Sequence, residues 1–154
     1  MAPDIDKIDK RILYHLQQDC TISMDVLAER VSLSRNACWR RIKQMEDRGI
    51  IRGRVALVDP AAIGLKLLVL VMIRTNDHAP DWLDRFAAAI RTMPEIMGAH
   101  RMTGDLDYML RVRVADVQDY DRFYQRLIAK VPIADISASF VMDDIKETTA
   151  LPLG

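Results

Sequence analysis

The sequence predicts an α+β protein with two parts: an N-terminal winged-type helix-turn-helix of three helices over residues 1–59, and a ferredoxin-like βαββαβ domain over residues 60–154. Three observations predict this organisation. Apolar residues recur at helical spacing in the first part, and serines stand where two of the helices would begin. From residue 65 onward, apolar runs typical of strands alternate with two helical patterns. The first part has a net charge of +2 and the second of −2, which indicates different partners.

Three helices are expected in the first part. The first helix is expected over residues 6–18, with Asp6 as its capping residue. The next two helices are expected to begin after Ser23 and Ser34. A serine in this position can accept a hydrogen bond from an otherwise unpaired N–H of the first turn. The apolar residues expected at helical spacing are Ile8, Ile12, Leu13, Leu16, Val26, Leu27, Val31, Cys38, Ile42 and Met45. A short helix, a tight turn and a second helix are typical of a DNA-binding helix-turn-helix.

Positive charge is concentrated around the third helix. Residues 30–54 contain eight Lys or Arg and two Asp or Glu, a net of +6 in a chain whose formal net charge is zero. Such charge suits phosphates, and amide or guanidinium groups can bind base edges. The predicted DNA-binding residues are Ser34, Arg35, Asn36, Trp39, Arg40, Lys43 and Gln44. For Trp39, packing against the first helix is favoured over contact with a sugar or base. The alternative for the whole helix is an amphipathic helix whose charges only face solvent.

Residues 50–58 look extended, and Asp59-Pro60 marks a break, so the domain boundary is placed at about residue 60. Residues 65–73 are nearly all apolar, whereas a strand with one wet face would alternate. This strand is therefore expected to be covered on both faces, by helices of its own domain and by a partner subunit. The sequence thus predicts a homodimer.

The second part continues with a helix over residues 80–93, strands over 96–102 and 108–114, a helix after Asp116 and a strand over 136–145. This order is that of a ferredoxin-like fold, with an antiparallel four-stranded sheet and both helices on one face. The side chains expected inside the two helices are Trp82 or Leu83, Phe86, Ile90, Met93, Val117, Tyr120, Phe123 or Tyr124, and Leu127.

The composition bounds the remaining functions. No apolar run is long enough to span a bilayer, and no apolar secretion signal is visible, so a cytoplasmic location is expected. Cys20 and Cys38 suggest neither a disulfide framework nor a metal cluster. We find no nucleophile–base pair, metal-ligand spacing or phosphate-binding loop. Neither an enzyme activity nor a cofactor is expected.

Three stretches resemble the Lrp/AsnC family, also called feast/famine regulators: residues 34–53, the Gly104-Asp105-Leu106-Asp107-Tyr108 turn, and residues 145–153. The turn matches the family's G-D-x-D-Y motif, and the resemblance covers nearly the whole chain. It implies a transcription regulator that binds double-stranded DNA, forms dimers that assemble to tetramers or octamers, and responds to a small molecule, usually an amino acid. It also implies an effector site around the turn, at a contact between dimers.

Carried over residue by residue, the resemblance implies these effector-binding residues: His100, Arg101, Met102, Thr103, Gly104, Asp105, Asp107, Tyr108, Ser139 and Val141. The chemistry fits an amino acid, because Asp105 or Asp107 can accept hydrogen bonds from its ammonium and backbone N–H groups of the turn can hold its carboxylate. The alternative is a plain turn, with Gly104 at a positive φ and aspartates that bond their own backbone.

Two departures from the family pattern affect specificity. Arg35-Asn36-Ala37 replace the prolines that often begin the family's DNA-binding helix, which suggests an unusual base preference. Arg101 stands where leucine-responsive members tend to have an apolar residue, and a cation there would suit an acidic or polar effector.

Three alternative functions remain open at this stage. The chain could be a regulator that needs no effector. It could be an enzyme that uses Asp105, Asp107 and His100. It could bind RNA through its second part, although residues 108–114 lack the aromatic pair that stacks on bases.

Overall fold

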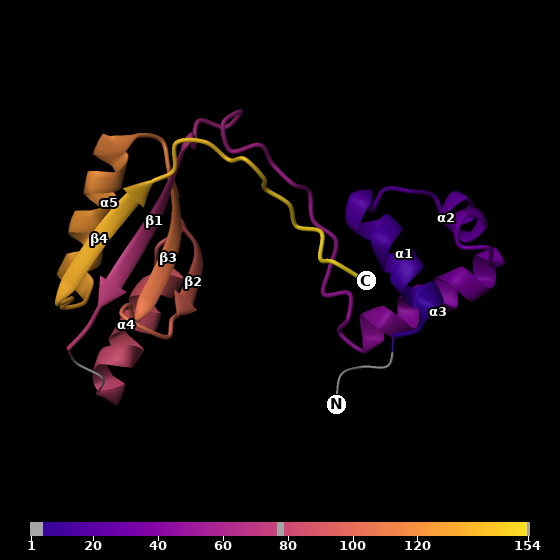
Figure 1. The fold of residues 1–154 in the computed structure, drawn as a ribbon, viewed down its shortest axis with the longest axis horizontal. Helices are drawn as coiled ribbons and strands as arrows, with labels where there is room; N and C mark the ends of the chain where they lie inside the picture. Colours follow the sequence, from indigo (N-terminus) through magenta and orange to yellow (C-terminus); the bar gives the residue numbers. More distant parts are fainter. Residues whose placement is uncertain (1–4, 77–78, 154) are drawn as a thin grey trace. The chain divides into compact units, whose positions relative to one another are not determined.

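The computed structural model describes residues 5–76 and 79–153, and these contain five helices and four strands (Figure 1). They form two compact units. One comprises the residues up to Leu57 together with those from Lys146 onward, and the other comprises Val58–Ile145. The domain border near residue 60 stays a prediction. The residues from Lys146 onward, which that prediction places in the second domain, lie in the compact unit of the helices, where Leu151 contacts Gln17 of α1.

The helical unit contains α1 (Lys7–Gln18), α2 (Met24–Arg30) and α3 (Arg35–Asp47). The three predicted caps are present, since the side chains of Asp6, Ser23 and Ser34 each accept a hydrogen bond from the first turn of their helix. The unit's core is formed by Ile12, Leu13, Leu27, Ala28, Val31, Cys38, Ile42 and Met45. Val26, predicted to be apolar and inward, is 41% exposed, because the short α2 buries only the face that bears Leu27 and Ala28.

The two helices of the helix-turn-helix end with the same backbone motif. After α2, Leu33 N–H donates to the Ala28 carbonyl over 2.9 Å and Ser32 N–H donates to the Glu29 carbonyl over 3.0 Å. After α3, Ile50 N–H donates to the Met45 carbonyl over 2.8 Å, and Gly49 N–H donates to the Glu46 carbonyl over 2.9 Å. These are Schellman motifs, which satisfy the last carbonyls of a helix and turn the chain sharply. The first of them sets the tight turn before α3.

The predicted linker strand over residues 50–58 is absent: the structure assigns no strand to residues 50–66. Strand hydrogen bonds need a neighbouring strand. Among the described residues of this single chain, no strand pairs with this segment. Its apolar side chains Val55 and Leu57 are 76% and 73% exposed.

The second unit contains β1 (Leu67–Arg74), α4 (Pro80–Thr92), β2 (Ile96–Arg101), β3 (Tyr108–Val114), α5 (Val117–Lys130) and β4 (Asp135–Phe140). The strands form one antiparallel sheet in the order β2-β3-β1-β4, as predicted for a ferredoxin-like fold (Figure 1). β4 is shorter than the predicted strand over 136–145. Beyond Phe140, Val141 N–H still donates to the Leu68 carbonyl over 2.9 Å, near the start of β1 at Leu67.

Both α4 and α5 cover one face of the sheet, because Trp82 and Phe86 of α4 and Phe123 and Leu127 of α5 share a core with the inward residues of β1 and β3. Leu83 is 43% exposed, so Trp82 is the inward residue of that pair. Val117, predicted to be inside, is 56% exposed, because it is the first residue of α5.

Neither helix of this unit, as far as its residues are described, covers the opposite face of the sheet. On this face β1 presents Leu68, Leu70 and Met72, and β3 presents Met109, which pairs with Met72. All four side chains are only partly buried. β1 was predicted to be covered on both faces. The helices of its own unit cover one face, and the cover of the other face by a partner subunit stays a prediction.

Candidate functional site

The outer side of α3 presents a row of polar side chains. Asn36, Arg40 and Gln44 are all exposed and follow one another at four-residue steps. Residues spaced in this way lie along one side of a helix. Cys38, Ile42 and Met45 fix the opposite side in the core. The predicted DNA-binding residues of α3 are thus brought together on one exposed face.

Exposed ion pairs engage two cations of this face. Arg35 lies 3.1 Å from Asp25 of α2, and Lys43 lies 2.9 Å from Asp47 one turn further along α3. The hydrogen bond from Lys43 to Asp47 raises the pKa of Lys43. Ion pairs with both partners exposed contribute only about 0–1 kcal/mol, so both cations can exchange these carboxylates for phosphates. Arg40 makes no ion pair within the described ranges.

Arg41 has a structural role. Its guanidinium contacts the Asp6 carboxylate at 2.7 Å and the Asp9 carboxylate at 2.8 Å, and its side chain is 29% exposed. Hydrogen bonds to Asp9 and then to Asp6 raise the pKa of Arg41. The pKa of Asp6 is lowered, first by the backbone N–H of Asp9 and then by Arg41. Arg41 therefore ties α3 to the start of α1.

Trp39 lies on the outside of α3 with 57% of its surface exposed. Trp39 is not among the side chains that form or pack against the core around Cys38 and Ile42, and its packing against the first helix stays a prediction. An exposed indole beside a polar row is available to a partner. Ser34, at the beginning of the same helix, is also exposed, and its hydroxyl accepts from Ala37 N–H over 3.3 Å.

The turn between β2 and β3 is fixed to the end of β1. Gly104 has φ +100°, which favours glycine. The Arg74 guanidinium donates to the Asp105 carbonyl over 2.7 Å. Asp107 N–H donates to the Ile73 carbonyl over 3.0 Å, and its carboxylate accepts from Thr75 N–H over 2.8 Å. Three hydrogen bonds therefore join the turn to the end of β1 and to Thr75, the residue after it.

Two of the predicted effector residues have structural roles. The Tyr108 ring is 9% exposed and packs in the core, with its centroid 4.6 Å from that of Phe86 and 5.8 Å from that of Trp82. The half-buried carboxylate of Asp107 is occupied by the backbone of Thr75. The exposed members of the predicted set around the turn are His100, Arg101, Met102, Thr103, Gly104 and Asp105.

Ser139 and Val141 do not join this cluster within one chain. Ser139 pairs with Leu70, whereas Tyr108 at the end of the turn pairs with Ile73, three residues further along β1. At roughly 3.3 Å per residue, Ser139 lies about 10 Å along the strand from the turn, and Val141 lies further away. Val141 instead lines a hollow of about 230 Å³ with Lys66, Leu68, Arg113, Met142, Asp143 and Asp144.

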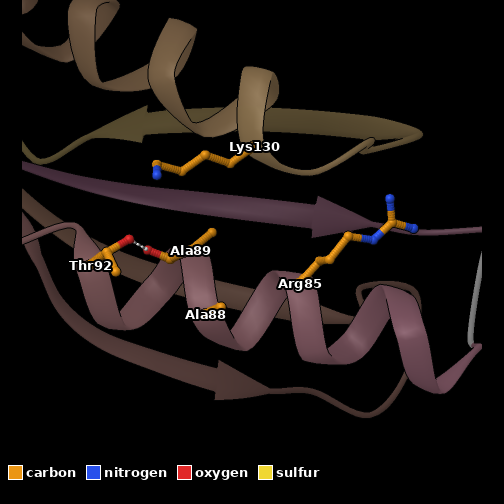
Figure 2. A pocket seen from close by; sticks show the side chains of 5 residues that line it. All are labelled: Arg85, Ala88, Ala89, Thr92 and Lys130. Atoms are coloured by element: carbon orange, nitrogen blue, oxygen red, sulfur yellow. Dashed lines mark hydrogen bonds between the residues drawn. The ribbon is translucent and has the colours of Figure 1, made fainter.

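A second hollow of about 270 Å³ lies on the helical side of the sheet, between α4 and α5. Figure 2 shows its lining, in which Arg85, Ala88, Ala89 and Thr92 follow one another along α4 and Lys130 comes from α5 across from them. The Thr92 hydroxyl donates to the Ala89 carbonyl over 3.0 Å. None of the predicted effector residues lines this groove.

The described ranges contain no group of three or more His, Cys, Asp or Glu side chains that could hold a metal ion. None of the helices in the described part of the chain is long and apolar enough to cross a membrane.

Comparison with known families matches both units. A model described as the Lrp/AsnC ligand binding domain matches residues 68–151. A model described as winged helix-turn-helix DNA-binding matches residues 5–52. The first match contains the turn and the sheet, and the second contains all three helices of the helical unit.

Individual proteins are similar over their full length. The chain is 49% identical over 150 residues to the DNA-binding transcriptional activator DecR of Escherichia coli (strain K12), which covers 97% of this chain and 99% of that protein. A solved AsnC family transcriptional regulator from Agrobacterium tumefaciens is 49% identical with a TM-score of 0.93, over 96% of this chain and 97% of that one. Transcriptional regulator NMB0573 from Neisseria meningitidis, solved as a complex with L-Met, is 36% identical with a TM-score of 0.93, over 97% of each chain.

Proposed function

The chain belongs to the Lrp/AsnC family and is a DNA-binding transcriptional regulator, and from this premise we propose how its residues bind DNA and a small-molecule effector. The DNA-binding face is the exposed side of α3. Asn36, Arg40 and Gln44 contact base edges in the major groove, while Arg35 and Lys43 bind the flanking phosphates. The single observation that supports this assignment most is the exposed polar row of α3, opposite its buried stripe.

Two further residues complete this face. Ser34 begins α3, and the free N–H groups at the start of a helix favour a phosphate. Trp39, exposed beside the row, packs against the sugar–phosphate backbone. Arg41 has no part in DNA contact, since its guanidinium is occupied by two carboxylates of the α1 start.

The bound form is a homodimer on double-stranded DNA, which assembles further to a tetramer or octamer. Two copies of α3 can then enter successive major grooves about one helical turn apart. The partly buried apolar face of the sheet supports pairing with a second copy, since neither helix of its unit, as far as its residues are described, covers that face. The exposed Val55 and Leu57 of the linker give a second apolar surface of the same kind. Such a regulator is expected in the cytoplasm.

The effector is an amino acid bound at the exposed part of the β2–β3 turn. A relative that is 36% identical was solved with L-Met, which supports an amino acid as the class of ligand. Asp105 is exposed and can accept hydrogen bonds from the ammonium. Arg101 is exposed on the preceding strand and favours an effector with an acidic or polar side chain. The site becomes complete where two dimers meet.

Thermal unfolding against a panel of amino acids, with L-methionine and L-glutamate included, tests the effector. A ligand at about 100 times its dissociation constant adds roughly 2.7 kcal/mol to the stability of the native state. The effector proposal predicts one or a few hits that disappear in Asp105→Asn. Asp107 is unsuitable for this test, because its carboxylate also holds the Thr75 N–H. A flat panel would contradict the amino-acid proposal and favour the alternative of an effector-independent regulator.

A further inference from the structure

The C-terminal segment is attached to the helical unit through one side chain of α1. The amide of Gln17 donates from Nε2 to the Leu151 carbonyl over 3.2 Å, and its Oε1 accepts from the Leu151 N–H over 2.7 Å. One side chain therefore satisfies both backbone groups of Leu151, as a neighbouring strand would. The two residues are 134 positions apart, so this contact is tertiary.

The sequence around Leu151 prepares the segment for this contact. Pro152 has a fixed φ and disfavours a helical conformation at Leu151, so the backbone is extended where Gln17 binds it. The Leu151 side chain is 71% exposed, whereas Leu153 is half-buried and packs against the cluster that contains Ile12 and Cys38. Leu151 is thus held by its backbone and Leu153 by its side chain.

We propose that α1 has a docking site for the chain's own C-terminal segment, residues 148–153, and that this docking completes the DNA-binding unit. The site consists of the Gln17 amide and the apolar surface that receives Leu153. The occupant follows from connectivity, because β4 ends at Phe140 and the residues from Lys146 onward already belong to the helical unit. The end of the chain lies against this unit (Figure 1).

Docking also links the two units of the chain a second time. The chain leaves the helical unit after Leu57 and returns to it at Lys146. The docked segment follows β4 in the sequence, and the described residues between them form no helix or strand. α1 is in turn joined to α3 by Arg41. The segment therefore contacts α1, the helix to whose start Arg41 joins α3.

The part of this inference that concerns DNA rests on the proposed function. If docking only keeps the unit in its binding-competent fold, undocking lowers the apparent DNA affinity in proportion to the population of that fold. The dependence of affinity on salt stays unchanged, because no phosphate contact is lost. Removal of a true phosphate contact lowers both quantities.

Two matched pairs of full-length variants test the docking. Gln17→Ala removes the docking amide, and Gln18→Ala truncates its exposed neighbour. Leu153→Ala removes the packed side chain, and Leu151→Ala truncates an exposed one while its backbone remains. We expect Gln17→Ala and Leu153→Ala each to lower the unfolding midpoint of the helical unit by about 4–8 °C. Hydrogen exchange of the Leu151 amide should accelerate about tenfold in both, and the two control variants should match the wild type.

Equal midpoints and equal Leu151 exchange in all four variants would overturn the docking site. Arg40→Ala separates this result from the proposed function, since it removes a proposed base contact and should weaken DNA binding while the unfolding midpoint is unchanged. If Arg40→Ala left DNA binding intact, the proposed function would fail. The unfolding and exchange data would still decide whether the segment docks on α1.

Discussion

Ser32 and Gly49 occupy the same position in two copies of one helix-ending motif, with φ +59° after α2 and φ +70° after α3. Each is the residue just past the helix cap, where the backbone must be left-handed for the Schellman hydrogen bonds to form. Glycine adopts this conformation without strain, whereas a serine there loses about 1 kcal/mol. The turn before α3 is therefore strained at Ser32, whereas the turn after α3 is relaxed at Gly49.

Ser32→Gly is expected to stabilise the helical unit by about 0.5–1 kcal/mol, since it relieves this strain. Gly49→Ala should destabilise it by about 1 kcal/mol for the opposite reason. A Cβ at Gly49 would meet no atom within 4 Å, so the loss would come from the backbone alone. Urea unfolding measures both changes. Gly53→Ala is the control, because Gly53 has no positive φ and equal open space, and a loss as large as that of Gly49→Ala would refute the argument.

Adjacent arginines of α3 should give opposite phenotypes. Arg41→Ala removes the ion pairs to Asp6 and Asp9, so it should lower the free energy of unfolding by about 1 kcal/mol, the net value of charged hydrogen bonds that are partly exposed. Arg40→Ala should leave stability within about 0.5 kcal/mol, as is usual for a surface position. Chemical unfolding of both variants checks this division. Equal stability losses would mean that Arg41 does not join α3 to α1.

Acid should destabilise the helical unit through Asp6. The folded pKa of Asp6 lies below its ordinary value, because the Asp9 N–H and Arg41 favour the carboxylate. This stabilisation is complete above the unfolded pKa, near 4, and is lost as the pH falls through the lower folded pKa. Unfolding measured between pH 2 and pH 6 should therefore show a decline below about pH 4. The decline should be shallower in Asp6→Asn, and an identical pH profile in that variant would exclude Asp6 as its cause.

Local features of the fold could be predicted from the sequence. The caps at Asp6, Ser23 and Ser34 and the buried stripe of α3 depend on neighbours a few residues away, and all of them are present. The antiparallel four-stranded sheet with both helices on one face also followed from the order of elements. Such features need only periodicity and short-range hydrogen bonding.

The features that the sequence did not indicate depend on contacts between distant residues. Trp39 was expected to pack against the first helix, and more than half of its surface is exposed; the position of α1, which determines this exposure, is not a local feature. β4 ends at Phe140, before the predicted end at residue 145, near the place where its partner β1 begins. The Gln17–Leu151 contact spans 134 positions, and no local pattern indicates it. In the candidate site, the motif located the turn, but only the structure separates the exposed Asp105 from Asp107, which holds β1.

Asp105 and Asp107 should therefore respond differently to substitution. Asp107→Ala leaves the Thr75 N–H without its carboxylate, so it should cost about 1.5–3 kcal/mol of stability in the second unit. Asp105→Ala should lower the free energy of unfolding by less than about 0.5 kcal/mol. The Asp105 side chain is exposed, and Arg74 bonds its backbone carbonyl, which the substitution keeps. Thermal and urea unfolding of the two variants would decide this. A larger loss at Asp105 would show that the two roles are reversed.

The central claim is that the exposed row of α3 binds DNA, and the most direct test is affinity for duplex DNA across a series of salt concentrations. A duplex selected by the protein from a random pool serves as the ligand for the wild type and for the double variant Arg40→Ala, Lys43→Ala. Arg85→Ala with Lys130→Ala is the control, since both cations lie on the groove between α4 and α5 (Figure 2). The account predicts that the α3 variant loses about tenfold or more in affinity, with a salt slope smaller by about one for each phosphate contact removed. The control should match the wild type. Unchanged affinity and slope in the α3 variant would contradict the account.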